Sequence, residues 1–227
     1  MENLTEIFVK EIERRILTGR WETGMKLPSS RALAEEFFVS RSVISVGIAQ
    51  LCRNGYLQTN SRGQVYVSDW KKMGNFSLLG SIMDNGILTA ETIDNLLESR
   101  MTLEKNIAAK AALSRTEEDL EYLHQVIEDE KHCTTPEEMT VADEAFHHAI
   151  VAASHNIVYT IMFNSFSTVT EKLTQRFYES TNEHKHVIEM HERIYHAILS
   201  GDAVHTEQFM EALLAHGEAE LRKQEEN

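Results

Sequence analysis

The sequence predicts a mainly α-helical protein of two domains, with a winged helix-turn-helix at the amino terminus and an antiparallel helical bundle after it. Three observations support this prediction. The 227 residues exceed the length of a comfortable single core. Two short β-prone runs occur, and both end before residue 68. The remaining chain has helical periodicity and a single proline, Pro136. We expect domains at 1–68 and 78–227, joined by a linker at 69–77.

The first three elements are predicted to be helices. Apolar residues recur at three- and four-residue steps over 4–17, which indicates an amphipathic helix that ends before Gly19. Ser29 or Ser30 can cap a second helix from about 31 to 37. Ser40 can cap a third helix over 41–54, and Gly55 terminates it.

Two β-prone runs, 56–59 and 64–67, flank the polar segment 60–63. This arrangement predicts a two-stranded hairpin with a flexible basic tip. Helix, short helix, helix and hairpin in this order form a winged helix-turn-helix, and its third helix is expected to enter the DNA major groove.

The second domain is predicted to be entirely helical, because no strand pattern or fixed-period repeat follows residue 77. The whole chain is 42% hydrophobic and 26% charged, which is the composition of an ordinary folded protein. Breaks in the helical periodicity divide it into six or seven helices. They fall near Gly86, Ser114, Thr134–Pro136, Asn156, Thr181–Asn182 and Gly201–Asp202. We expect this bundle to bind an effector and to dimerise.

The charge of the chain is unevenly distributed. The net charge is −14, but residues 1–70 hold nine Lys and Arg against eight Asp and Glu. The acidity therefore lies in the second domain and does not exclude a DNA partner. Neither a signal peptide nor an apolar run of membrane-spanning length is apparent, which favours a cytoplasmic protein without membrane contact. Cys52 and Cys133 lack the spacing of a thiolate metal site.

The stretch 24–67 resembles the GntR family of transcription regulators. The resemblance is carried by Leu27-Pro28-Ser29, Leu33-Ala34, Val39-Ser40-Arg41, Leu51 and Gly55-Tyr56-Leu57. It implies that a homodimer binds a palindromic double-stranded operator and that Arg31 and Arg41 contact DNA. Ser45 stands where a third arginine is expected. The predicted DNA-binding residues are Arg31, Ser40, Arg41, Ser42, Ser45, Arg62 and Gly63.

Asp143 and His147 are four residues apart on a predicted helix and therefore share one face. A carboxylate and an imidazole at this spacing can chelate one divalent metal ion, and helical bundles commonly complete such sites from facing helices. The same spacing is also typical of a hydrogen-bonded pair on a helix surface.

The segments 143–156 and 190–202 resemble the ligand-binding FCD domain of the FadR subfamily. The resemblance implies a divalent metal, zinc or nickel, held by one Asp and three His. Asp143, His147 and His191 fall at matching positions, and His216 lies about one helical turn later than the family spacing. It also implies that Arg100 binds the carboxylate of a small organic acid. A salt bridge from Arg100 to Glu104 is the alternative interpretation.

Several functions are consistent with the sequence. The layout around 79–83 and 94–100 resembles an acyl-CoA-binding branch of the subfamily that lacks the metal ligands, so acyl-CoA is the alternative effector. A structural metal or a metal sensor is also consistent with the ligands. A metal-dependent hydrolase is disfavoured, because no general base or nucleophile motif accompanies the ligands and the DNA-binding domain would be unexplained.

Overall fold

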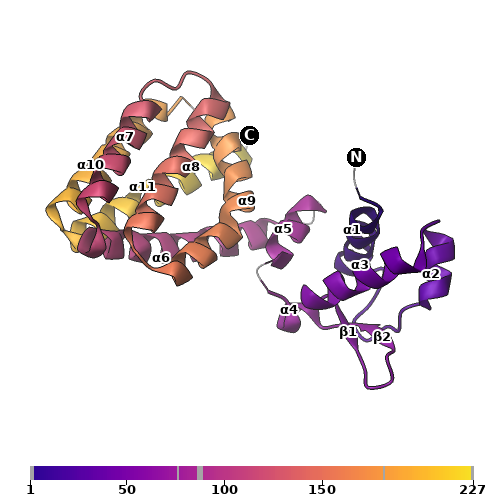
Figure 1. Cartoon of the computed structure of the whole chain (residues 1–227). Helices are drawn as coiled ribbons and strands as arrows, with labels where there is room; N and C mark the ends of the chain where they lie inside the picture. Colours follow the sequence, from indigo (N-terminus) through magenta and orange to yellow (C-terminus); the bar gives the residue numbers. More distant parts are fainter. Residues whose placement is uncertain (1–2, 76, 86–88, 181, 226–227) are drawn as a thin grey trace. The chain divides into compact units, whose positions relative to one another are not determined.

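The computed structural model of the chain describes residues 3–75, 77–85, 89–180 and 182–225 (Figure 1). The chain divides into two compact units, Met1–Thr89 and Ala90–Asn227. The predicted helix breaks at Gly86 and Thr181 lie outside the described residues.

The first unit contains the predicted winged helix-turn-helix, and the bounds of its elements agree with the sequence prediction to within one residue. The elements are α1 (Leu4–Leu17), α2 (Ser30–Glu36), α3 (Arg41–Arg53), β1 (Leu57–Thr59) and β2 (Val65–Val67). The two strands are antiparallel, and Leu57 lies opposite Val67 while Thr59 lies opposite Val65.

A buried apolar core fixes α3 against α1 in this unit. Phe8, Ile12 and Ile44 have no exposed surface. The two helices approach so closely at Gly47 that a Cβ atom there would lie 2.4 Å from the Phe8 ring. The absence of a side chain at Gly47 therefore allows α1 to hold the predicted recognition helix in place.

The segment after the hairpin departs from the predicted boundary between linker and bundle. The predicted linker, 69–77, contains a short helix, α4 (Trp70–Met73), and α5 (Ser77–Asp84) follows it. Leu78 is buried in the core of the first unit, and α5 packs against α1. The first unit therefore extends to residue 89, because the apolar face of α5 has its packing partner there.

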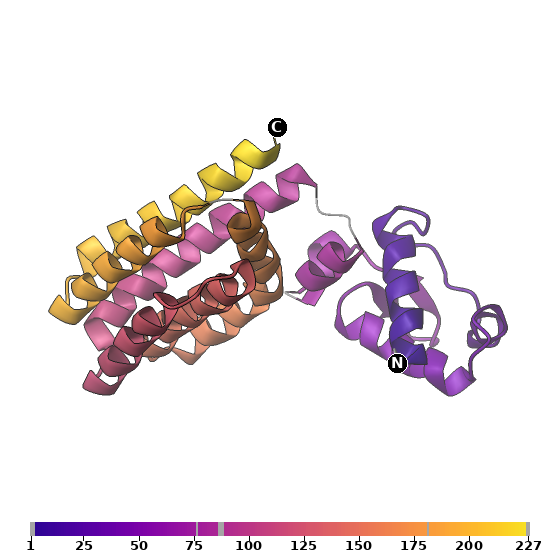
Figure 2. The same cartoon turned by 90° about the horizontal axis from the view of Figure 1, so that it is seen from above.

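The second unit is a bundle of helices in the part of the chain that the structure describes, as predicted. Its elements are α6 (Ala90–Ser114), α7 (Glu117–Glu130), α8 (Pro136–Ala153), α9 (Ile157–Ser180), α10 (His184–Ser200) and α11 (Ala203–Glu225). Figure 2 shows α6, α10 and α11 side by side, and α8 packs against α6, α7 and α9. Among the described residues, no helix is both long and apolar enough to cross a membrane.

Local sequence signals explain where these helices begin and end. The Thr135 side chain accepts a hydrogen bond from the Glu138 amide, and Pro136 occupies the first turn of α8. Gly201 has a φ of 75° and ends α10 in the left-handed conformation that favours glycine. These ends orient α8 and α10 so that each carries a histidine into the core, at His147 and His191.

Candidate metal centre and candidate DNA interface

The structure brings three of the predicted metal ligands together. Asp143 and His147 lie on α8 and His191 lies on α10, and all three are buried. One ligand atom from each side chain lies within 4.8 Å of the other two. The ring of His191 also stacks on Phe146, with 3.7 Å between the ring centroids. The i, i+4 pair on α8 therefore faces the bundle interior, not the surface.

Each histidine has a carboxylate on the side away from this cluster. Nδ1 of His191 lies 2.8 Å from Oε2 of Glu130, and Nδ1 of His147 forms an ion pair with Oε2 of Glu104. The two Nε2 atoms face Asp143, at 3.9 Å for His147 and 3.7 Å for His191. Nε2 of His191 is buried without a hydrogen-bond partner in the described structure.

This arrangement fits a divalent metal. Metal-binding histidines commonly present one ring nitrogen to the ion and the other to a carboxylate, which fixes the ring and raises its basicity. A buried imidazole nitrogen without a partner is costly unless something occupies the space before it. Asp143, His147 and His191 could therefore hold a metal ion between them.

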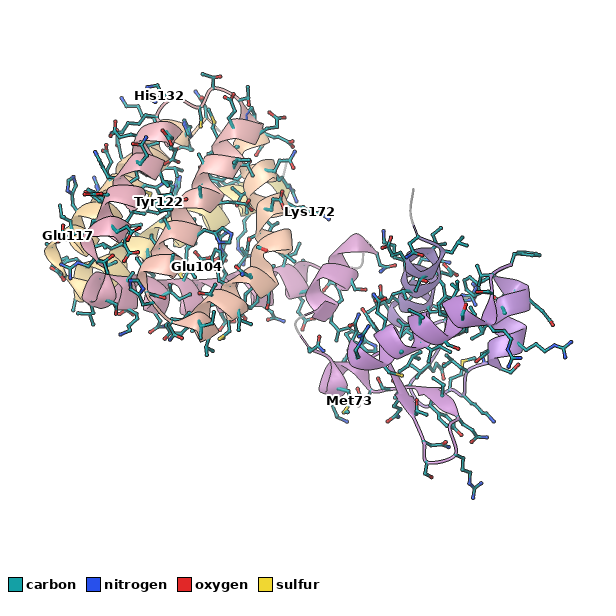
Figure 3. All side chains as sticks on the ribbon, in the orientation of Figure 1. Met73, Glu104, Glu117, Tyr122, His132 and Lys172 are labelled. Atoms are coloured by element: carbon teal, nitrogen blue, oxygen red, sulfur yellow. The ribbon has the colours of Figure 1, made fainter. Side chains whose placement is uncertain are left out.

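A buried charge network connects this cluster to Arg100. Glu104, labelled in Figure 3, lies on α6 and is 3% exposed. Its Oε1 accepts a hydrogen bond from Nε of Arg100 at 2.5 Å. Burial alone would raise the pKa of Glu104, but the charges of Arg100 and His147 outweigh it and lower the pKa to about 2. Burial opposes charge on His147, yet Glu104 overcomes this effect and raises its pKa.

The salt bridge between Arg100 and Glu104, which was the alternative interpretation of Arg100, is thus present in the structure. It does not remove Arg100 from the site, since Arg100 lines a cavity together with Asp143 and His147.

Tyr178 on α9 adds a further contact to the cluster. Its hydroxyl donates a hydrogen bond to Oδ1 of Asp143 at 3.0 Å, within the bundle core. Burial and the nearby Asp143 and Glu130 raise the pKa of the Tyr178 phenol, so it remains a donor across the physiological pH range. Tyr178 therefore helps to orient the Asp143 carboxylate.

Glu130 and Tyr178 were not predicted as site residues from the sequence. A signal for Glu130 is nevertheless present, because it continues the buried face of α7 formed by Leu123, Val126 and Ile127. A glutamate at an apolar helix position requires a buried partner. The sequence alone does not indicate that the partner is His191.

The cavity beside the cluster has a volume of about 60 Å³. Its apolar lining includes Leu173, Val187 and Leu213, and its polar lining consists of Arg100, Asp143, His147, Thr174, His216 and Glu218. His216 lies outside the three-residue group, and its Nε2 is 3.7 Å from Oε2 of Glu183. The role of His216 as a metal ligand stays a prediction.

The predicted DNA-binding residues are all exposed on the first unit. Oγ of Ser40 accepts a hydrogen bond from the Val43 amide at 3.3 Å and caps α3, whose first turn contains no acidic residue. Arg41 is exposed at this end, where a helix amino terminus favours phosphate. Arg31 is 80% exposed and pairs with Glu35 at 3.0 Å. Such surface pairs are weak, so Arg31 can exchange Glu35 for a phosphate.

The tip of the hairpin has a defined conformation. Oδ1 of Asn60 accepts hydrogen bonds from the backbone amides of Arg62 and Gln64, both at 3.0 Å. Gly63 has a φ of 72°, a backbone conformation that glycine adopts readily and residues with a side chain rarely adopt. This turn leaves the Arg62 side chain exposed. DNA contact by Arg62 and Gly63 stays a prediction.

A winged helix-turn-helix followed by a helical bundle that contains a cavity is an architecture typical of DNA-binding transcription regulators. Residues 4–67 match the bacterial regulatory proteins of the gntR family, and residues 95–216 match the FCD domain. The chain therefore belongs to the GntR family, in the FadR subfamily with its FCD domain.

Three related proteins of known sequence agree with this assignment. The chain is 30% identical to the HTH-type transcriptional regulator LutR of Bacillus subtilis (strain 168), over 88% of this chain and 92% of LutR. It is 31% identical to a regulatory protein assigned to the L-lactate dehydrogenase operon of Escherichia coli (strain K12), over 80% and 72%. It is 30% identical to the Glc operon transcriptional activator of the same strain, over 86% and 80%. These relatives are transcription regulators and not enzymes.

Solved structures agree at the level of the fold. Lar, which controls the expression of the agr system of Listeria monocytogenes, superimposes with a TM-score of 0.65 over 98% of both chains, at 17% identity. McbR/YncC of Escherichia coli superimposes with a TM-score of 0.56 over 99% of both chains, at 18% identity.

Proposed function

We propose that this protein is a homodimeric regulator whose affinity for a palindromic operator is controlled by a small carboxylate bound at a metal site. The observation that carries the proposal is the convergence of Asp143, His147 and His191, of which the first two line a cavity together with Arg100. Two of these potential metal ligands, Asp143 and His147, and the Arg100 guanidinium then face the same small space.

The ligand set favours a borderline transition metal. Imidazole and carboxylate donors suit zinc and nickel, and we expect one of these two ions. Asp143, His147 and His191 would hold it, with His216 as the predicted fourth ligand. The bound metal would supply positive charge that attracts the oxygen atoms of an anionic effector.

The size and charge of the cavity favour a small acid over acyl-CoA. A buried water needs about 10–15 Å³ of comparable space, so a cavity of about 60 Å³ suits a molecule of a few heavy atoms. A long acyl chain would need the bundle to open. The Arg100 guanidinium can bind both oxygens of one carboxylate. One relative is assigned to the L-lactate dehydrogenase operon, and lactate is an acid of this size.

A route for the response follows from the chain connectivity. Arg100 and Glu104 both lie on α6, and only residues 85–89 separate α6 from α5, which packs against α1 of the DNA-binding unit. An effector that draws Arg100 toward the metal would change the charge balance around Glu104 and shift α6. In a dimer, such a shift can change the spacing of the two heads on the operator.

Fluorescence anisotropy of a labelled operator tests the proposal. The operator is first selected from randomised duplexes with the full-length protein, which is then loaded with zinc or nickel. We expect short 2-hydroxy acids such as L-lactate, or short dicarboxylic acids, to change operator affinity in the metal-loaded protein and not after metal removal. A response to long-chain acyl-CoA together with none to small acids would overturn the proposed effector class.

A further inference from the structure

The outward face of α3 has an unusual composition beyond its first residue. Val46 is 56% exposed, whereas Ile44 and Leu51 on the opposite face have no exposed surface. The exposed residues between Arg41 and Arg53, the two ends of the helix, are Ser42, Ser45, Val46 and Ala49. At 3.6 residues per turn these four positions span about 100° of the helix circumference. They form one stripe of small or aliphatic side chains, and the exposed Arg53 follows on the same side at the end of the helix.

The two serines of this stripe have partners within the protein. The Ser45 hydroxyl donates to the backbone oxygen of Arg41 at 3.0 Å, and Oγ of Ser42 lies 2.7 Å from Oγ of Ser40. Among the exposed residues of α3 from Arg41 to Ala49, only Arg41 has a long hydrogen-bonding side chain. The remaining face presents the methyl groups of Val46 and Ala49 to solvent.

We propose that Val46 is a specificity-determining residue that recognises the 5-methyl group of a thymine in the operator half-site. This inference rests on the proposed function, in which α3 enters the major groove. The thymine methyl is the apolar group on the major-groove edge of the four bases, so it is the feature that an aliphatic side chain can distinguish. Charge also favours DNA as the occupant, because Arg41 lies at the amino terminus of the same helix and no acidic residue stands in its first turn.

The choice of valine is itself informative. Valine has a lower helix propensity than alanine, so an exposed Val46 does not serve the stability of α3. Its branched Cβ restricts χ1 in a helix to one strongly preferred rotamer. The two methyl groups of Val46 are therefore held in fixed directions, and contact with a thymine methyl would need little further ordering.

Deoxyuridine substitution tests this contact directly, because uracil differs from thymine only by the 5-methyl group. Each thymidine of the selected operator half-site is replaced in turn, and Kd is measured at one fixed salt concentration. For the wild type we expect one position to weaken binding about fourfold, the factor to which burial of one methyl group corresponds. For Val46→Ala the same replacement should have no effect. Val204→Ala removes another exposed valine, from α11, and should behave like the wild type.

The outcomes separate this inference from the proposed function. Failure of the wild type to bind any selected duplex would overturn the proposed function. Operator binding with equal deoxyuridine sensitivity in the wild type and Val46→Ala would overturn the role of Val46 alone. Thermal melting followed by circular dichroism verifies the fold, and alanine at this exposed helical position should leave the melting temperature unchanged or raise it.

Discussion

Glu130 and His191 form a completely buried pair, in which Oε2 of the carboxylate lies 2.8 Å from Nδ1 of the ring. The contact assigns the Nδ1 face of His191 to Glu130 and leaves Nε2 directed at Asp143. Because both side chains are buried, removal of either one would leave the other without its partner in the core, which is energetically unfavourable. The pair thus determines which ring nitrogen His191 offers to a metal.

Replacing Glu130 should weaken metal binding without removing it. We expect Glu130→Gln to lower the affinity for zinc or nickel by about 10–100-fold, the usual effect of losing a carboxylate behind a metal-binding histidine. Glutamine retains the shape and an oxygen acceptor, so the fold should persist. Competition against a chromophoric chelator measures the affinity. Glu121→Gln, an exposed change on the same helix, is the control, and equal affinities for the two variants would contradict the prediction.

Arg100 should bind the effector and not the metal. We expect Arg100→Met to retain the metal but to lose the response of operator affinity to small acids, because methionine keeps the bulk of the side chain without its donors. The structure adds a complication, since this change leaves the buried Glu104 without its arginine partner.

A second variant avoids this complication. Arg100→Lys keeps a positive charge beside Glu104 but loses the planar, two-point contact with a carboxylate. We expect the effector concentration at half-maximal response to rise about tenfold or more, the loss that one charge-assisted hydrogen bond would cause. Metal content per chain should match the wild type. A normal effector response in both variants would assign the carboxylate contact to another residue.

Arg41 should contribute to operator affinity but not to the fold. Because Arg41 is exposed at the capped end of α3, Arg41→Ala removes no core contact. Loss of a specific base contact should cost about 1–3 kcal/mol of operator binding. Arg53→Ala removes the same charge from the exposed far end of α3 and serves as the control. Gel shifts of Arg41→Ala that match the wild type at equal salt would show that another element enters the groove.

The winged helix-turn-helix could be predicted from sequence because local signals determine each of its elements. The caps at Ser29 and Ser40 and the alternation in the hairpin all act within a few residues. The boundary after the hairpin could not be predicted in the same way. The position of α5 depends on Leu78 entering a core built from residues far away in the chain, and no local pattern encodes that choice.

The candidate metal site could likewise be predicted only in part. Helical geometry alone placed Asp143 and His147 on one face, and the structure brings His191 to them. Glu104 and Glu130 were not identified as partners of the two histidines, because those contacts depend on how α6 and α7 pack in space. For His216, the departure from the family spacing left its role as a ligand open, and in the structure it lines the cavity but lies outside the three-residue group.

The start of α7 depends on a single carboxylate. Asp119 accepts a hydrogen bond from the Thr116 amide at 2.8 Å, and the Thr116 hydroxyl accepts one from the Asp119 amide. Nε2 of His155 lies 2.7 Å from the same carboxylate. Burial raises the pKa of Asp119, but the hydrogen bonds from Thr116 and His155 outweigh it and hold the pKa below its usual value.

This lowered pKa gives the stability of the bundle a defined pH dependence. A carboxyl group whose pKa is lower in the folded state stabilises the fold above its unfolded pKa of about 3.9, and this contribution is lost as the pH falls through the folded pKa. We therefore expect Asp119→Asn to lower the free energy of unfolding by about 1 kcal/mol at pH 7, the typical contribution of a helix cap. The difference from the wild type should stay constant down to about pH 5 and shrink below about pH 4. Urea unfolding of the metal-free protein across this range measures it, with Glu118→Gln as a control that removes the same charge from the same turn. A difference that does not change between pH 7 and pH 3 would show that ionised Asp119 is not the source of the stabilisation.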